Sequence, residues 1–113
     1  MSKRSVKLLL QDILEAVHNI SIYTAEISFD EFMSDQKTKD AVVRNFEIIG
    51  EAANKLHKNF LDQNKQIDWA GIVGFRNILV HDYFGIDYEI LWKIKSDSLP
   101  KLESEINVLL NQL

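Results

Sequence analysis

Residues that interrupt helices are scarce in this chain, and their scarcity limits the folds open to it. Among 113 residues there are four glycines and a single proline, Pro100. Because glycine and proline are the strongest local breakers of secondary structure, so few of them favour long helices. No segment of useful length alternates apolar and polar residues with the period of two that marks a half-buried strand. The sequence therefore predicts an all-α fold.

Apolar residues recur at intervals of three and four along most of the chain, the spacing of one helix face. The predicted helices cover residues 3–25, 38–60, 69–81, 87–95 and 98–113. Their N-caps are expected at polar residues, namely Thr38 or Asp40, Asp68, Asp87 and Ser98. The last two segments are either separate helices or one helix kinked at Pro100. We therefore expect an antiparallel four- to five-helix bundle that occupies residues 1–113 as a single domain.

Polar stretches between these helices predict the connections. Residues 28–35 are expected to form a loop with one short turn around Phe32, and residues 59–66 a second connection. The charged run DQKTKD, residues 35–40, is interpreted as a solvated turn.

Three glycines lie inside predicted helices: Gly50 in the second, and Gly71 and Gly74 in the third. Each weakens a helix interior by about 1 kcal/mol relative to alanine. Either the helices tolerate this loss, or the glycines allow two backbones to approach closely where the helices cross.

Charge and composition exclude several classes of function. The net charge is −4 and the pI is about 5.3, whereas proteins that bind duplexes tightly are usually basic. The acidity argues against coating of nucleic acid but not against catalysis on RNA at a local basic site.

Without cysteine the chain has neither disulfides nor thiolate metal ligands. Neither a secretory signal nor a run of ~18 apolar residues is present, so we expect a cytoplasmic location and no membrane contact.

The segment RNILVHDY, residues 76–83, carries polar groups that packing alone does not require. On a straight helix the side chains of Arg76 and His81 point about 140° apart and lie ~7.5 Å apart along the axis. Arg76 must therefore reach around, or the helix must loosen near His81, or a second chain must complete the site. His81 stands at a predicted helix C-terminus, where the helix dipole favours the imidazolium form.

An arginine near a histidine suits cleavage of a phosphodiester. Arginine offers a fixed fork of donors to phosphate oxygens, and histidine passes protons near neutral pH. RNA supplies its own nucleophile, the 2′-hydroxyl, so neither a metal ion nor a protein nucleophile is needed. The three histidines, His18, His57 and His81, are scattered and form no metal-binding motif.

Structural explanations compete with this chemistry. Arg76 can instead pair with Glu47 or Glu51, and the spacing of Arg44, Glu47 and Glu51 on one helix face is typical of a salt-bridged surface rather than of a catalytic group. His18 and His57 are better explained as solvated surface residues. Phe75, Trp69 and Trp92 are better explained as core or interface residues than as platforms for base stacking.

The string RNILVHDY, preceded by IDWAGIVGF, resembles the signature of the HepT-like ribonuclease toxins of the HEPN superfamily: Arg, four to six residues, His, and a tyrosine two residues later. Arg76, His81 and Tyr83 fit this signature without a gap. VRNFEIIGEAANKL (residues 43–56) resembles the second helix of that family. LLQDILEAVHNISIYT resembles its first helix and IDYEILWKIKSDSLPKLESEI its last, so the resemblance covers nearly the whole chain.

This resemblance implies a helical bundle that forms a homodimer and cleaves RNA without metal or cofactor. His81 would be the general acid/base, Arg76 would hold phosphate, and Asn77 would help to shape the site. The implied partner is an MntA-like nucleotidyltransferase antitoxin of a type VII toxin–antitoxin system, which transfers AMP from ATP to Tyr83. The alternative is a non-catalytic helical partner of such a nucleotidyltransferase, although the intact motif argues against it.

Overall fold

The computed structural model describes residues 4–113, and the regular elements among them are all helices joined by turns and short irregular segments. The longer helices are α1 (Val6–Thr24), α3 (Gln36–Lys55), α5 (Trp69–His81) and α7 (Leu99–Asn111). Shorter elements complete the fold: α2 (Phe29–Met33), α4 (Lys58–Asp62), η1 (Tyr83–Gly85), α6 (Tyr88–Lys93) and η2 (Ile94–Ser98). No strand occurs among residues 4–113, which confirms the predicted all-α class. The predicted helix start at Lys3 lies outside the described residues.

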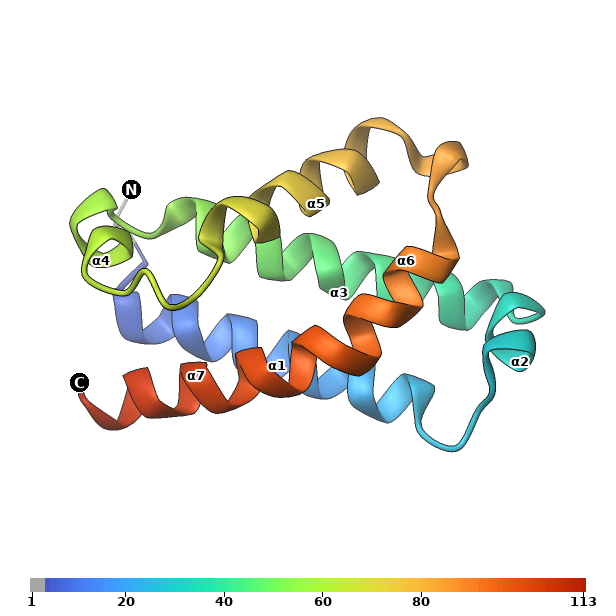
Figure 1. Ribbon diagram of the computed structural model, residues 1–113, viewed down its shortest axis with the longest axis horizontal. Coiled ribbons are helices and arrows are strands. Elements are labelled where there is room, and N and C mark those ends of the chain that lie inside the picture. The colour runs from blue at the N-terminus through green and yellow to red at the C-terminus, as the bar shows by residue number, and fades with distance from the viewer. Residues whose placement is uncertain (1–3) are drawn as a thin grey trace.

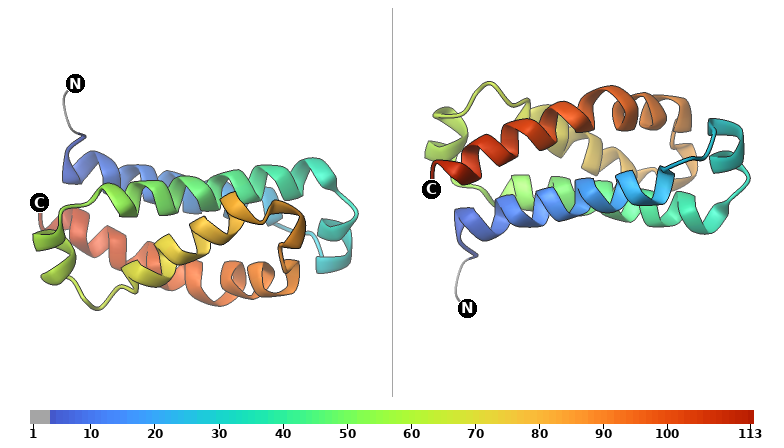
Figure 2. Two further views of the ribbon diagram at one scale, coloured as in Figure 1. Left: turned by 90° about the horizontal axis from the view of Figure 1, so that it is seen from above. Right: turned by 90° about the horizontal axis from the view of Figure 1, so that it is seen from below.

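The helices form an antiparallel bundle in which α1 lies between α3 and α7, and α5 packs on the outer side of α3 (Figure 1). Figure 2 shows the two ends of the bundle. One end carries the start of α1, the end of α7 and α4, and the other carries α2 and the turn that contains η1. The segment after α5 therefore comes close to the start of α3, although the two are far apart in the sequence.

One apolar core joins the long helices. Its fully enclosed side chains come from every layer of the bundle: Leu10, Ile13, Ile20, Phe32, Val42, Leu79, Leu91 and Ile106. Full burial of a side chain of this size stabilises the fold by roughly 1.5–3 kcal/mol. The tryptophans confirm their interpretation as packing residues, since Trp69 is buried and Trp92 packs against Phe29 and Phe32.

The start of α3 differs from the prediction. Asp35 is the N-cap, since its carboxylate accepts hydrogen bonds from the backbone N–H and the hydroxyl of Thr38. Thr38 and Asp40 are therefore not caps but lie inside the helix, and residues 36–40 of the predicted turn are helical. Several neighbouring residues can all cap a helix, so local chemistry alone does not choose between them.

The other end of α3 also differs, as do the two predicted connections. Leu56 leaves the helix in an extended conformation and is buried, so α3 stops short of residue 60. Part of the predicted second connection, Lys58–Asp62, forms α4. The predicted loop at residues 28–35 contains α2, which is stabilised by a capping box between Ser28 and Glu31.

The last helix is continuous through the predicted break. Ser98 has helical backbone angles and makes no capping hydrogen bond, so the predicted cap there is wrong. Instead, the backbone widens into the π-helical turn η2, in which the N–H of Leu99 bonds to the carbonyl of Ile94. Pro100 follows directly, where the wider turn accommodates a residue that has no N–H to donate.

Candidate active site

Arg76 is positioned by a close crossing of α3 and α5. A Cβ added at Gly50 would lie 2.1 Å from the Cβ of Arg76 and 2.6 Å from its Cγ. It would also lie 3.3 Å from the carbonyl oxygen of Ile72. Only glycine allows α5 to approach this closely, so the expectation of close backbone approach is confirmed at Gly50.

The other two helix glycines have different surroundings. A Cβ at Gly71 would meet the carboxylate of Asp68, the N-cap of its own helix, at 2.2 Å, whereas a Cβ at Gly74 would meet nothing within 4 Å. Close approach of a second helix is therefore wrong for both positions. Gly74 instead gives α5 an open and exposed surface.

The guanidinium of Arg76 is only partly satisfied. Its Nη1 donates a 2.8 Å hydrogen bond to the side-chain oxygen of Asn77. Its Nε is buried and has no hydrogen-bond partner among residues 4–113. A buried donor without an acceptor is unfavourable, and in a charged group more so. Asn77 is exposed beside it and limits the orientations of the fork.

His81 is the last residue of α5, and its side chain is exposed. The helix remains regular up to His81, and the N–H of Asp82 closes it on the carbonyl of Ile78. No hydrogen bond joins the side chains of Arg76 and His81 in the described chain. Since α5 does not loosen before His81, the two groups are not brought together by a change in helical geometry.

Tyr83 lies in η1, beyond the end of α5, and is 38% exposed. Its hydroxyl donates a hydrogen bond to Asp40 of α3, and Gln36 Nε2 donates to the same hydroxyl over 3.4 Å. Gln36 also donates to Asp40 over 2.9 Å. The hydrogen bond to Asp40, together with burial, raises the pKa of Tyr83 to about 12. The same bond, followed by that from Gln36, holds the pKa of Asp40 below its ordinary value.

Asp40 and Gln36 are site residues that the sequence did not indicate as such. They stand one helical turn apart in a polar stretch, while Tyr83 is 43 residues beyond Asp40 in the chain. The two helix positions form an i, i+4 pair, but no sequence spacing links them to Tyr83.

The acidic face of α3 is structural. Arg44 lies 3.5 Å from Glu47 and 3.7 Å from Glu51, which confirms the interpretation of a salt-bridged face. Arg44 is exposed and the two glutamates are partly exposed, so solvent screens these pairs and they contribute little to stability. Arg76 pairs with neither glutamate in the described part of the chain. His18 and His57 are exposed, as expected.

Three residues within three positions of His81 in the chain expose apolar side chains. Ile78 is 55% exposed, Val80 44% and Phe84 100%. Ile78 lies one turn before His81 on α5, and Phe84 follows three residues after it. Exposed large apolar side chains are typical of an interaction surface when they form a patch.

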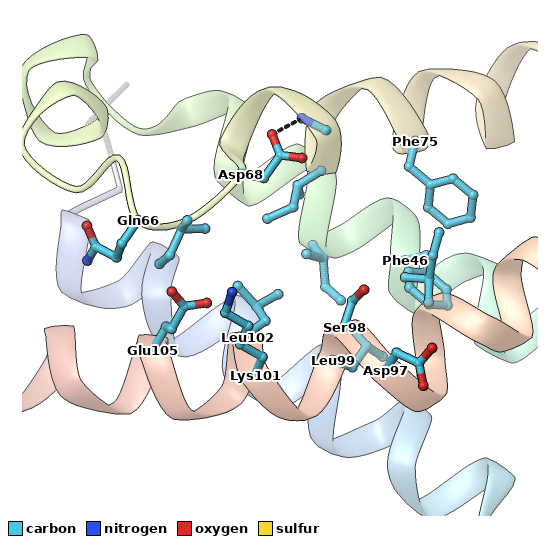
Figure 3. Close-up of a pocket in the computed structure, with 15 residues that line it drawn as sticks. Phe46, Gln66, Asp68, Phe75, Asp97, Ser98, Leu99, Lys101, Leu102 and Glu105 are labelled. Atoms are coloured by element: carbon cyan, nitrogen blue, oxygen red, sulfur yellow. Dashed lines mark hydrogen bonds between the residues drawn. The ribbon is translucent and has the colours of Figure 1, made fainter.

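An apolar cavity of about 350 Å³ lies elsewhere, between α5 and α7. Figure 3 shows Phe46 and Phe75 at one end and Leu99 and Leu102 along the floor. Carboxylates line it as well, from Asp68, Asp97 and Glu105, and neither Arg76 nor His81 contributes to it. Lys101 also lines the cavity, but the three carboxylates leave its lining net negative, which disfavours a phosphate.

The described chain offers neither a cluster of metal ligands nor a membrane-spanning helix. Residues 4–113 contain no group of three or more histidine and carboxylate side chains arranged to hold a metal ion. Among the same residues, no helix has the length and apolar character needed to cross a membrane.

Comparison with known proteins finds one matching family and several relatives named as ribonucleases. The family model described as Ribonuclease HepT-like matches residues 13–109. A Methanocaldococcus jannaschii protein named as a candidate RNase is 43% identical over 108 residues, which cover 96% of this chain and 99% of the relative. A Thermococcus cleftensis protein named as a probable ribonuclease HepT is 40% identical over 107 residues, covering 95% and 97%. A comparison with solved structures gives no match.

The helical fold and these matches together define a small all-α ribonuclease. More particularly, the chain belongs to the HepT-like ribonuclease family.

Proposed function

We propose that this chain is the toxin of a type VII toxin–antitoxin system, a metal-independent endoribonuclease of the cytoplasm. One observation supports this most directly. The guanidinium of Arg76 has a buried Nε without an acceptor, five residues before an exposed imidazole at the end of the same helix. The guanidinium is suited to hold a phosphate, and an imidazole from a second copy of the chain can then transfer protons at the bond to be cleaved.

The reaction is cleavage by the 2′-oxygen of RNA. This oxygen attacks the neighbouring phosphorus, a 2′ O–P bond forms, and the bond from phosphorus to the 5′-oxygen breaks. A neutral imidazole accepts the 2′-hydroxyl proton, and an imidazolium donates a proton to the leaving oxygen. Arg76 binds the phosphate and stabilises the charge that develops on it. Asn77 keeps the guanidinium in its orientation through the 2.8 Å hydrogen bond.

A homodimer completes this site. Within one chain, Arg76 and His81 point to different sides of a regular helix, so one copy does not enclose a phosphate between them. A second copy packed against the exposed Ile78 and Phe84 would bring another Arg76 and another His81 to the same place. Two histidines then provide the base and the acid.

Regulation is proposed to act at Tyr83. A nucleotidyltransferase antitoxin of the MntA type transfers AMP from ATP to its hydroxyl. Tyr83 is partly exposed, and it lies two residues beyond His81, so a bulky adduct there would block RNA. The phosphate of the adduct would also repel the phosphates of the substrate.

Cleavage of RNA in the presence of a chelator tests the nuclease. Arg76→Ala and His81→Ala should each lose at least ~100-fold in cleavage rate, as expected for removal of a charge stabiliser or a general acid/base. Arg44→Ala and His18→Ala, which remove the same side-chain types from exposed positions elsewhere, serve as matched controls. If folded Arg76→Ala and His81→Ala proteins cleave like the wild type, the assignment fails. The chain would then be better described as a non-catalytic partner of the nucleotidyltransferase.

A further inference from the structure

The hydroxyl of Tyr83 is held by a carboxylate from another part of the chain. Tyr83 donates its proton to Asp40, and Gln36 holds both groups by donating to the carboxylate and to the phenol oxygen. Asp40 and Gln36 lie on adjacent turns at the start of α3, so they form a rigid support. The arrangement joins the turn after the catalytic helix to a different helix of the bundle.

This geometry leaves the phenol oxygen able to react. The proton points towards Asp40, and the hydrogen bond from Gln36 is long, at 3.4 Å. The oxygen therefore retains a lone pair, and the residue is 38% exposed. Phe84 packs edge-on against the Tyr83 ring, with 5.4 Å between ring centroids.

We propose that Asp40 is the general base for transfer of a nucleotide to Tyr83, so that the acceptor protein carries its own proton acceptor. This proposal rests on the proposed modification of Tyr83. The phenol oxygen attacks the α-phosphorus of a nucleoside triphosphate, a new O–P bond forms, and the bond from the α-phosphorus to the bridging oxygen breaks. Pyrophosphate leaves, and the phenol proton passes to Asp40. A carboxylate serves in the same way in protein kinases, where an aspartate accepts the proton of the substrate hydroxyl.

Other ionisable groups near the pair do not replace Asp40. Tyr88 of α6 is close enough to influence Tyr83 but is itself a phenol with a raised pKa, so it is not a base near neutral pH. Lys39 of α3 lies over the ring of Tyr88, at 4.8 Å from its centroid, and its charge helps to keep Asp40 ionised. His81 and Asp82 precede Tyr83 in the chain, but neither bonds to its hydroxyl in the described structure.

The test uses adenosine 5′-phosphorimidazolide, a reagent that transfers AMP without an enzyme and releases imidazole. Asp40→Asn keeps the shape of the side chain but removes the base. Asp62→Asn makes the same change of charge on α4, at the opposite end of the bundle. Incorporation at Tyr83 is followed by peptide mass spectrometry at pH 7.5 and 9.5. Tyr23, which is 41% exposed on α1, reports the reactivity of the reagent in each sample.

At pH 7.5 we expect Tyr83 of Asp40→Asn to react at least ~10-fold more slowly than Tyr83 of Asp62→Asn. At pH 9.5 the difference should largely disappear, because the phenol released from Asp40 ionises and needs no base. Gln36→Ala, which keeps the carboxylate, should show a smaller loss that is the same at both pH values. Equal rates for the two asparagine variants at pH 7.5 would overturn the proposal. So would a deficit in Asp40→Asn that persists unchanged at pH 9.5, because that pattern indicates orientation alone.

A second experiment distinguishes failure of the base assignment from failure of the proposed toxin–antitoxin function. The wild-type chain is incubated with ATP and a nucleotidyltransferase antitoxin of the MntA type, and its intact mass is measured. If the reagent distinguishes the variants but the enzyme adds no AMP to the wild type, the toxin–antitoxin assignment fails on its own. If the enzyme modifies wild type and Asp40→Asn at the same rate, the base assignment fails and the modification stands.

Discussion

The Cβ of Arg76 occupies the space that a side chain at Gly50 would need, with 2.1 Å between it and the position of an added Cβ. The contact is between rigid parts of two helices rather than between flexible side-chain ends. Gly50→Ala must therefore displace α5 from α3. Overpacking of this kind destabilises a fold by about 1–3 kcal/mol. Because Arg76 moves with the helix, RNA cleavage should fall by at least ~10-fold. Thermal unfolding and cleavage rates measure the two effects.

Gly74→Ala is the matched control for Gly50→Ala. An added Cβ at Gly74 meets no atom within 4 Å, so the substitution brings only the higher helix propensity of alanine. We expect it to stabilise the fold by up to ~1 kcal/mol. If both alanine variants have equal stability, the close crossing at Gly50 does not exist.

Much of the fold could be predicted from the sequence because the signals are local. The bounds of α5 follow from the N-cap at Asp68 and from the irregular residues after His81, and both were predicted correctly. The N-cap of α6 at Asp87 was also predicted correctly. The start of α3 was not, since Asp35, Thr38 and Asp40 all have capping side chains and only packing selects among them. The π-helical turn before Pro100 likewise depends on how the whole helix packs, not on a local motif.

In the candidate site, too, the sequence predicts the residues that lie close together in the chain but not the contact between distant ones. Arg76, His81 and Tyr83 stand within eight residues and form a recognisable pattern. The support of Tyr83 by Asp40 comes from a helix 43 residues away and has no sequence signature. The contact exists because the bundle returns the end of α5 to the start of α3, which only the three-dimensional arrangement reveals.

Arg76→Lys tests whether the shape of the guanidinium matters as well as its charge. Lysine keeps a positive charge but cannot offer two parallel donors to a phosphate or the same bond to Asn77. We expect cleavage to fall by about 10- to 100-fold, mainly in kcat, because in the proposed mechanism the fork acts on charge that develops in the transition state. Arg44→Lys, on the salt-bridged face, should cleave like the wild type. Full activity in Arg76→Lys would mean that charge alone is sufficient.

Ile78→Asp tests the proposed dimer. Ile78 is 55% exposed in the single chain, so a carboxylate there leaves the fold of one protomer unaffected. Within an apolar interface, two like charges related by symmetry would oppose association. We expect sedimentation to show monomers in place of dimers, and cleavage of RNA to be lost with them.

Ile22→Asp provides the comparison, since Ile22 is 57% exposed on α1, a different helix from the one that carries His81. It should remain dimeric and active. A monomeric Ile78→Asp protein with normal cleavage would contradict a site shared between protomers, whereas a monomeric wild type would contradict the dimer itself.

Titration of Tyr83 tests the link between η1 and α3 directly. The pKa of Tyr83 is raised from 10.0 to about 12, chiefly by its hydrogen bond to Asp40. A group whose pKa is higher in the folded state stabilises the fold fully below its unfolded pKa. The contribution of Tyr83 is therefore present below pH 10 and is lost as the pH rises towards 12. Asp40 has a lowered pKa, so its contribution is present above 3.8 and is lost as the pH falls below that value.

Asp40→Asn should bring the pKa of Tyr83 back towards 10, as followed by NMR of ring-labelled tyrosine, while the Tyr23 signal stays unchanged. A Tyr83 titration that is the same in both proteins would show that Asp40 does not hold the phenol in solution.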